Sequence, residues 1–255
     1  MRGIGYFSVA AACLLLGCAE DTEVVTPPVR TALENMKQLE GDVERAAMEE
    51  RSRLANEVGR VPGEHEADVP QSGTYEAEFV TTTGSFTIRV HREWAPRGAH
   101  RFYQLVKAGF YDDCGFFRVV PDFMVQFGIA AIPSVHAAWN TEIADDPVKE
   151  SNTRGRVTFA TSGPDSRTSQ VFINFKDNSF LDSQGFAPFG EVVKGMDSVD
   201  KISSVHGEDP QQPMIESQGN TYLKSAFPSL DYVKSARITL DDQPAKPDAD
   251  QTAAP

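Results

Sequence analysis

The sequence predicts a mainly β domain that closes into a barrel, and two observations support this prediction. Short apolar segments recur between residues 74 and 240, and glycine, proline, aspartate and serine separate them. Only a few segments have helical spacing of their apolar residues. Many short strands with few helices are typical of a closed β-barrel.

The charge of the chain is concentrated outside this β region. The formal net charge is −13, of which residues 19–71 contribute −7 and residues 241–255 contribute −3. We therefore expect one globular domain at residues 72–240, an acidic spacer at 18–71 and a disordered acidic tail at 241–255. So acidic a chain is not expected to bind nucleic acid, because phosphate binding needs clustered lysine and arginine.

The N-terminus has the pattern of an export signal. Arg2 precedes an apolar run, Val9–Leu16, which is too short to span a bilayer but fits a signal peptide. The motif "LLGC", which ends at Cys18, resembles the lipobox of bacterial lipoproteins, in which the cysteine is diacylated and becomes the new N-terminus. We expect residues 1–17 to be the signal peptide and Cys18 to be lipidated, with an ordinary cleaved signal as the alternative.

This resemblance implies where the protein is located and how it is attached to a membrane. The protein would be anchored in the cell envelope through its lipid, and two acyl chains are about what stable anchoring requires. Ala19 after Cys18 resembles the signal for outer-membrane sorting, so a cell with two membranes would carry the protein on the periplasmic face of the outer one.

The spacer contains a helix-favouring stretch. Leu33, Met36, Leu39 and Val43 lie three to four residues apart, but the heptad needed for a coiled coil fails further on. We weigh a solvated, partly helical spacer against an oligomerisation helix and expect the spacer, and with it a monomer. As a flexible coil, roughly 50 residues would reach about 40 Å.

The domain begins with a hairpin and a helix. "TYEAEFVTTTGSFTIRVH", residues 74–91, alternates apolar and polar residues on both sides of a Thr83-Gly84 turn, which predicts a β-hairpin. In "APRGAHRFYQLVKAGFY", residues 95–111, the apolar residues share one helical face, Pro96 opens the helix and Gly109 closes it. Six further short apolar segments follow, ending with "SARITL".

Several kinds of site find no support in the sequence. It has no phosphate-binding loop, no His-Glu-x-x-His, no paired cysteines for zinc and no Gly-x-Ser-x-Gly elbow. Cys114 follows two aspartates, whose charge would raise its thiol pKa, so we expect a structural role for it. The five scattered histidines are expected to be surface or helix residues and not metal ligands, and we expect neither a metal nor an organic cofactor.

One segment, "FFRVVPDFMVQFG", residues 116–128, places an arginine and a glutamine among apolar residues. It resembles the signature of the cyclophilins, the peptidyl-prolyl cis-trans isomerases that bind cyclosporin. In that family an arginine is followed by Phe-Met and then a glutamine, and these fall on Arg118, Phe123, Met124 and Gln126. The resemblance implies an eight-stranded antiparallel barrel with a helix over each end.

Two further blocks extend the resemblance to about residues 74–240. "GRVTFATSGPDSRTSQVFINF" resembles the family segment that contributes an alanine, a glutamine and a phenylalanine to the pocket, and "FLDSQGFAPFGEVVKGMD" resembles its last pocket strand and following helix. The pocket residues implied by these blocks, with Thr161 as a backbone partner of the peptide, are Ala160, Thr161, Gln170, Phe172, Phe180 and Phe186. Phe180 stands where many eukaryotic members have tryptophan, and Phe186 where they have histidine.

An insertion at about residues 205–234 departs from the family pattern. We expect residues 217–227 to include a helix, which either packs on the domain or binds a partner, and we expect packing.

The residue types suit prolyl isomerisation. Rotation about an X–Pro bond breaks amide resonance, and no nucleophile is needed. A guanidinium such as that of Arg118 can donate to the proline nitrogen in the twisted state, and Gln126 can fix a substrate carbonyl. We therefore predict a peptidyl-prolyl isomerase that acts on proline-containing segments of exported or envelope proteins. The alternative is a non-catalytic proline-binding chaperone or scaffold, but Arg118 and Gln126 are both present, which favours the enzyme.

Overall fold

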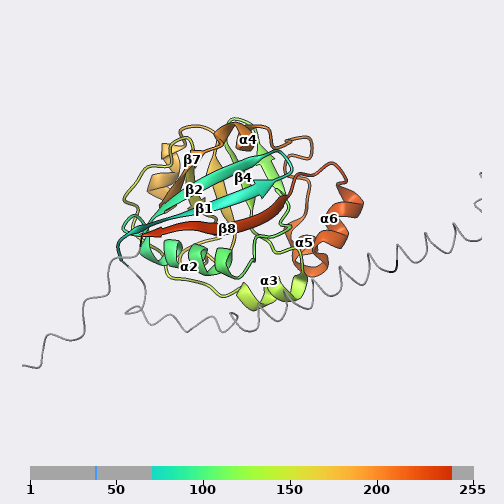
Figure 1. Cartoon of the computed structure of the whole chain (residues 1–255), viewed down its shortest axis with the longest axis horizontal. Helices are drawn as coiled ribbons and strands as arrows, with labels where there is room; N and C mark the ends of the chain where they lie inside the picture. The colour runs from blue at the N-terminus through green and yellow to red at the C-terminus, as the bar shows by residue number, and fades with distance from the viewer. Residues whose placement is uncertain (1–37, 39–70, 243–255) are drawn as a thin grey trace, which may run out of the picture. The chain divides into compact units, whose positions relative to one another are not determined.

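The computed structural model describes Gln38 and residues 71–242, and eight strands in the second range form one curled antiparallel sheet (Figure 1). The strand order is β3-β4-β6-β5-β7-β2-β1-β8. The strands are β1 (Thr74–Thr81), β2 (Ser85–His91), β3 (Arg118–Val120), β4 (Met124–Phe127), β5 (Arg156–Phe159), β6 (Val171–Asn174), β7 (Pro188–Lys194) and β8 (Val233–Asp242). The predicted signal peptide, Cys18, the spacer and the tail beyond residue 242 lie outside the described residues.

The predicted hairpin is present as β1 and β2. Phe79 pairs with Phe86 across the ladder, and their rings stack at 5.1 Å between centroids. The turn closes with a bond from the Thr81 amide to the Gly84 carbonyl at 2.9 Å. Gly84 has φ +129°, a conformation that side chains rarely adopt, so the turn requires glycine.

The sheet does not close into a complete barrel. Strands β3 and β8 are its two edges, and an isolated bridge between Gly115 and Tyr232 joins the segments that precede them. The predicted mainly β, eight-stranded antiparallel architecture is confirmed, but the closed barrel is not. The Val119 amide on the outer edge of β3 donates to the Gly207 carbonyl at 2.9 Å, so a loop of the insertion, and not β8, occupies this edge.

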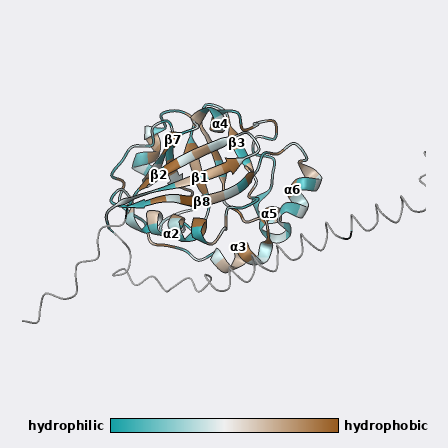
Figure 2. Ribbon diagram, in the orientation of Figure 1, coloured by the Kyte–Doolittle hydropathy of each residue, from teal (hydrophilic) through white to brown (hydrophobic). Residues whose placement is uncertain are grey.

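The core lies between the sheet and helix α2 (Pro96–Lys107). This helix buries Ala99, Phe102, Leu105 and Val106, which is the face that their spacing predicts. It packs against β2, β7 and β8. Apolar residues lie along the strands that pack against this helix (Figure 2).

The predicted second capping helix is only partly present. Helix α3 (Pro133–Trp139) has seven residues, buries Val135 and Trp139 in the core and packs against α5 (Gln212–Gln218). The Cys114 thiol is buried in the same core and donates to the Phe110 carbonyl at 3.5 Å.

The insertion folds as two short helices. Helix α6 (Asn220–Ala226) lies within the range where a helix was expected, and α5 precedes it. Gly219 joins them at φ +58°, where a Cβ would collide with the Ala131 carbonyl. A second apolar cluster lies beneath the insertion and consists of Phe117, Ile129, Ile215, Leu223 and Leu230. The remaining short helices are α4 (Met196–Asp200) and the 3₁₀ helix η2 (Ser179–Gln184).

Candidate active site

A cleft of about 780 Å³ lies where β3, β4 and β6 meet the loops that follow β5 and α3. All but one of the pocket residues expected from the sequence line it: Arg118, Phe123, Met124, Gln126, Ala160, Thr161, Gln170, Phe172 and Phe186. A second hollow of about 450 Å³ adjoins the cleft and shares Arg118, Gln212 and Glu216 with it.

The polar side chains of the cleft form a chain of hydrogen bonds. In the β3–β4 hairpin Arg118 pairs with Gln126, so both side chains leave the same face of the sheet. Arg118 Nη1 donates to Gln126 Oε1 at 3.2 Å, and Gln126 Nε2 donates to Gln170 Oε1 at 2.8 Å. Gln126 is only 6% exposed, while the Arg118 side chain is 33% exposed. The buried amide thus holds a cation at the mouth of the cleft.

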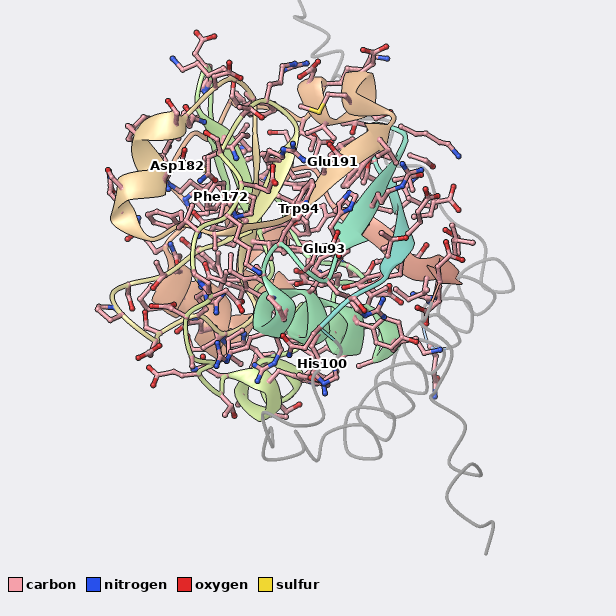
Figure 3. The ribbon with its side chains drawn as sticks, turned by 90° about the vertical axis from the view of Figure 1, so that its left-hand side faces the viewer. Glu93, Trp94, His100, Phe172, Asp182 and Glu191 are labelled. Carbon is pink, nitrogen blue, oxygen red and sulfur yellow. The ribbon has the colours of Figure 1, made fainter. Side chains whose placement is uncertain are left out.

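Apolar side chains form the floor beside this chain. Met124, Phe172 and Leu181 are buried together, and Phe186 packs edge-on against Phe172 with centroids 5.8 Å apart. Figure 3 shows Phe172 on its strand near η2, the helix that carries Asp182. The Arg118 guanidinium carbon lies 6.0 Å from the centroid of Phe123, which brings the cation next to the apolar surface.

The structure places Phe180 on the rim and outside the cleft lining. It belongs to η2, is 55% exposed and stacks on Phe123 with centroids 6.0 Å apart. Its ring can extend the apolar surface outward from Phe123. It does not form part of the floor that Phe172 and Met124 build.

Asp182 fixes η2 against the sheet. Asn152 donates to Asp182 Oδ1 through its amide at 2.9 Å and its side chain at 2.8 Å, and Ser151 Oγ donates to Oδ2 at 2.5 Å. Burial by itself raises the pKa of Asp182, but these hydrogen bonds outweigh it and lower the pKa below its ordinary value. Asn152 also donates to the Phe186 carbonyl at 2.8 Å. The same polar cluster therefore fixes the positions of Phe186 and of Leu181, which precedes Asp182.

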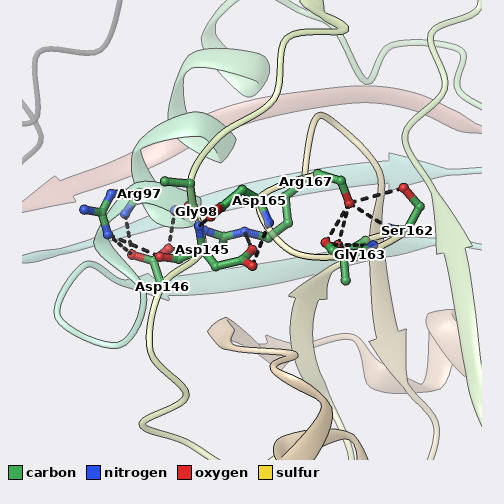
Figure 4. A network of polar contacts seen from close by, with 11 residues as sticks. Arg97, Gly98, Asp145, Asp146, Ser162, Gly163, Asp165 and Arg167 are labelled. Carbon is green, nitrogen blue, oxygen red and sulfur yellow. Dashed lines mark hydrogen bonds and ion pairs between the residues drawn. The ribbon is translucent and has the colours of Figure 1, made fainter.

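An ionic network joins the loops that follow α3 and β5 to helix α2 (Figure 4). Arg167 Nη1 bonds Asp146 at 3.0 Å, and Asp146 accepts from the Gly98 amide of α2 at 2.9 Å. Buried Arg101 of α2 donates to the Thr141 carbonyl at 2.7 Å and the Thr168 carbonyl at 3.3 Å. Two loops far apart in sequence are thereby tied to one helix.

Nine further residues that line the cleft were not predicted from the sequence. They are Asn140, Thr141, Glu142, Ser162, Ser166, Thr168, Leu181, Gln212 and Glu216. All nine lie outside the strands, so no strand-like alternation marks them. A signal was present for Ser162, Ser166 and Thr168, which lie within the segment that contains Ala160 and Gln170, and for Leu181, which lies within the segment that contains Phe180 and Phe186.

His136 of α3 is a buried histidine close to the cleft. Burial lowers its pKa from the ordinary value, and the neighbouring Glu216 carboxylate, 3.8 Å from Nε2, raises it in part. Glu216 belongs to α5 and lines the cleft, so the two helices meet at this pair. No group of three or more metal-ligating side chains comes together in residues 71–242.

The family of the chain follows from comparison with known proteins. Residues 77–219 match the family model described as "Cyclophilin type peptidyl-prolyl cis-trans isomerase/CLD". A peptidyl-prolyl cis-trans isomerase of Acinetobacter baylyi is 40% identical over 150 residues, which cover 54% of this chain and 80% of that protein. The chain belongs to the cyclophilin-type peptidyl-prolyl cis-trans isomerases.

Further similarity agrees with this assignment. Peptidyl-prolyl cis-trans isomerase A of Dickeya dadantii is 39% identical over 152 residues, covering 54% of this chain and 79% of that protein. The crystal structure of a cyclophilin-type isomerase of Cryptosporidium parvum matches with a TM-score of 0.51 at 17% identity, over 65% of this chain and 98% of that one, which shows a shared fold. The prediction of an isomerase, and so of an enzyme, is confirmed.

Proposed function

We propose that this cyclophilin isomerises X–Pro bonds in the cleft through Arg118. The observation that carries the proposal is the hydrogen-bonded row from Gln170 through Gln126 to Arg118, set directly beside an apolar floor. A proline residue presents the same combination, an apolar ring next to one polar hinge. The cleft is therefore complementary to an X–Pro segment, the part of a polypeptide in which rotation about the peptide bond is slow.

The chemistry requires the twisted amide to be bound more tightly than either planar form. The rotation barrier is about 20 kcal/mol because twisting breaks amide resonance. In the twisted state the proline nitrogen regains its lone pair and can accept a hydrogen bond. A guanidinium that already points into the cleft stabilises this state without reorganising, and it makes no matching bond to the planar amide.

The other residues of the site hold the two sides of the bond. Phe123, Met124 and Phe172 bury the proline ring, since all three lie on or against the floor. Gln126 binds a carbonyl on one side of the bond, and the backbone at Ala160 and Thr161 pairs with the extended peptide on the other. Clamping one side while the other turns lowers the barrier with no covalent step.

We also propose that the protein is a monomeric lipoprotein of the cell envelope that helps exported proteins to fold. The support is the "LLGC" motif at Cys18 and the long acidic spacer before the domain. In cells with two membranes the protein would face the periplasm from the outer membrane. In residues 71–242 no helix is long and apolar enough to cross a bilayer.

The isomerase proposal is tested by the rate of cis-to-trans conversion of a model proline peptide with the full chain. We expect the chain to raise this rate well above the uncatalysed rate. Phe172→Ala should bind the peptide more weakly and turn it over more slowly, because it removes part of the floor. A rate equal to the uncatalysed one for the folded chain would overturn the proposal and leave a binding module.

The anchoring proposal has a separate test. Cys18→Ser removes the only thiol that the motif offers for acylation, so it should abolish labelling with a radioactive fatty acid and release the protein from membranes. Membrane association equal to that of the unmodified chain would contradict the lipoprotein form.

A further inference from the structure

The insertion brings a carboxylate to the outer side of Arg118. Glu208 Oε1 accepts a hydrogen bond from Arg118 Nε at 2.6 Å, while Nη1 of the same guanidinium donates to Gln126 at 3.2 Å. Two neighbours from different parts of the chain therefore hold two different nitrogens of one planar group. The third nitrogen, Nη2, makes no hydrogen bond within residues 71–242.

The position of Glu208 is fixed by backbone bonds to the strand that carries the arginine. The Val119 amide, next to Arg118, donates to the Gly207 carbonyl at 2.9 Å. The turn around Gly207 is closed by its own amide, which donates to the Ser204 carbonyl at 3.0 Å. Glu208, which follows Gly207 in the chain, is therefore only one residue away from a direct backbone contact with β3.

The insertion is in turn held on the domain by its own core. Phe117, on the other side of Arg118, packs with Ile215, Leu223 and Leu230 of the insertion in the second apolar cluster. His206, two residues before Glu208, bonds Ser229 Oγ at 2.8 Å. These contacts order the turn in the absence of substrate. The conformational entropy lost when Glu208 binds Arg118 therefore comes mainly from the Glu208 side chain.

We infer that Glu208 is a positioning residue for the isomerisation: it fixes the orientation of the Arg118 guanidinium and leaves Nη2 available to the substrate. The inference rests on the proposed role of Arg118. Arginine has many rotamers, and the reaction requires one in which a donor points at the proline nitrogen. Gln126 alone holds one edge of the guanidinium, whereas Gln126 and Glu208 together define its plane.

The test is the isomerisation kinetics of the full chain with three single variants. Glu208→Ala should lower kcat/KM about three- to fivefold, the range of a strong exposed ion pair, with most of the loss in kcat. Glu208→Gln keeps an oxygen acceptor for Nε and should lose less. Asp209→Asn is the matched control, because it removes the same charge from the neighbouring residue, which lines neither hollow. It should behave as the unmodified chain does.

A double-mutant cycle separates positioning from a general effect on folding. If Glu208 acts through Arg118, Glu208→Ala should cause no further loss when Arg118→Ala is already present. The same loss in both backgrounds would overturn the inference, as would unchanged kinetics of Glu208→Ala or an equal loss in Asp209→Asn.

The cycle also distinguishes the two proposals. If Arg118→Ala keeps full activity, the proposed role of Arg118 fails and the role of Glu208 fails with it. If Arg118→Ala is impaired while Glu208→Ala is not, only the inference about Glu208 is overturned.

Discussion

Replacing Arg118 by alanine tests the catalytic arrangement most directly. The change removes the donor proposed for the proline nitrogen and leaves the floor of Met124 and Phe172 in place. Losing one preorganised donor typically costs about 2.7–4 kcal/mol, or roughly 10²–10³ in rate. The Arg118 side chain is one-third exposed, and water screens part of its effect, so we expect the lower end, about 10².

Peptide affinity should fall much less than the rate. The apolar floor still buries the proline ring, and that burial contributes to binding in the planar and twisted states alike. Arg118→Lys should recover little activity, because an ammonium group cannot bond Gln126 and Glu208 and also face the substrate as the planar guanidinium does.

The fold should survive the change with a measurable loss of stability. Without Arg118 the Oε1 atom of Gln126 loses its partner, but it faces the cleft, where water can take the place of the guanidinium. The cost is therefore that of one ordinary hydrogen bond, about 0.5–1.5 kcal/mol. The assay is the cis-to-trans rate and the peptide affinity, with circular dichroism to show that the variant is folded. Near-normal turnover by a folded Arg118→Ala protein would refute the reasoning and leave Arg118 as a rim residue.

Three further outcomes follow from the structure. The isomerisation rate should be flat between roughly pH 6 and 8.5, because the proposed reaction moves no proton to or from the substrate; a bell-shaped profile would indicate an acid or base outside the proposed set. Because the folded pKa of His136 lies below the ordinary 6.5, the unfolded chain binds more protons than the folded one just below pH 6.5, so stability should fall as the pH drops through that region. His136→Gln should reduce this fall in urea unfolding curves at pH 7 and pH 5, and an unchanged difference would argue against it. Asp182→Ala should lower stability by about 1–3 kcal/mol, since it leaves Asn152 donors unpaired, and it should weaken peptide binding through η2, whereas loss of stability with unchanged binding would show that η2 does not shape the cleft.

Much of the fold could be predicted because local patterns decide it. Alternation of apolar residues on both sides of Gly84 determines the β1–β2 hairpin, and the apolar face of α2 is visible in its spacing. Helix α6 fell within its expected range. The closed barrel could not be decided in the same way, because the edge of β3 depends on the Gly207 carbonyl, which lies nearly ninety residues away along the chain.

For the site, the sequence by itself determined the residues of β3, β4 and β6 and five beside these strands: Phe123, Ala160, Thr161, Gln170 and Phe186. Arg118 and Gln126 are eight residues apart, and only a hairpin with the observed register places them opposite each other. Their residue types and spacing were enough to suggest a polar pair in an apolar pocket.

Tertiary structure decided what surrounds this pair. Thr141 and Thr168 reach the cleft because buried Arg101 binds both loops, and Glu208 reaches Arg118 because the insertion packs on Phe117. Such contacts join residues of widely separated segments, and their energies come from burial and charge pairing that exist only once the chain is folded. Local periodicity therefore reveals the strands that carry the chemistry, while long-range packing selects the loops that complete the site.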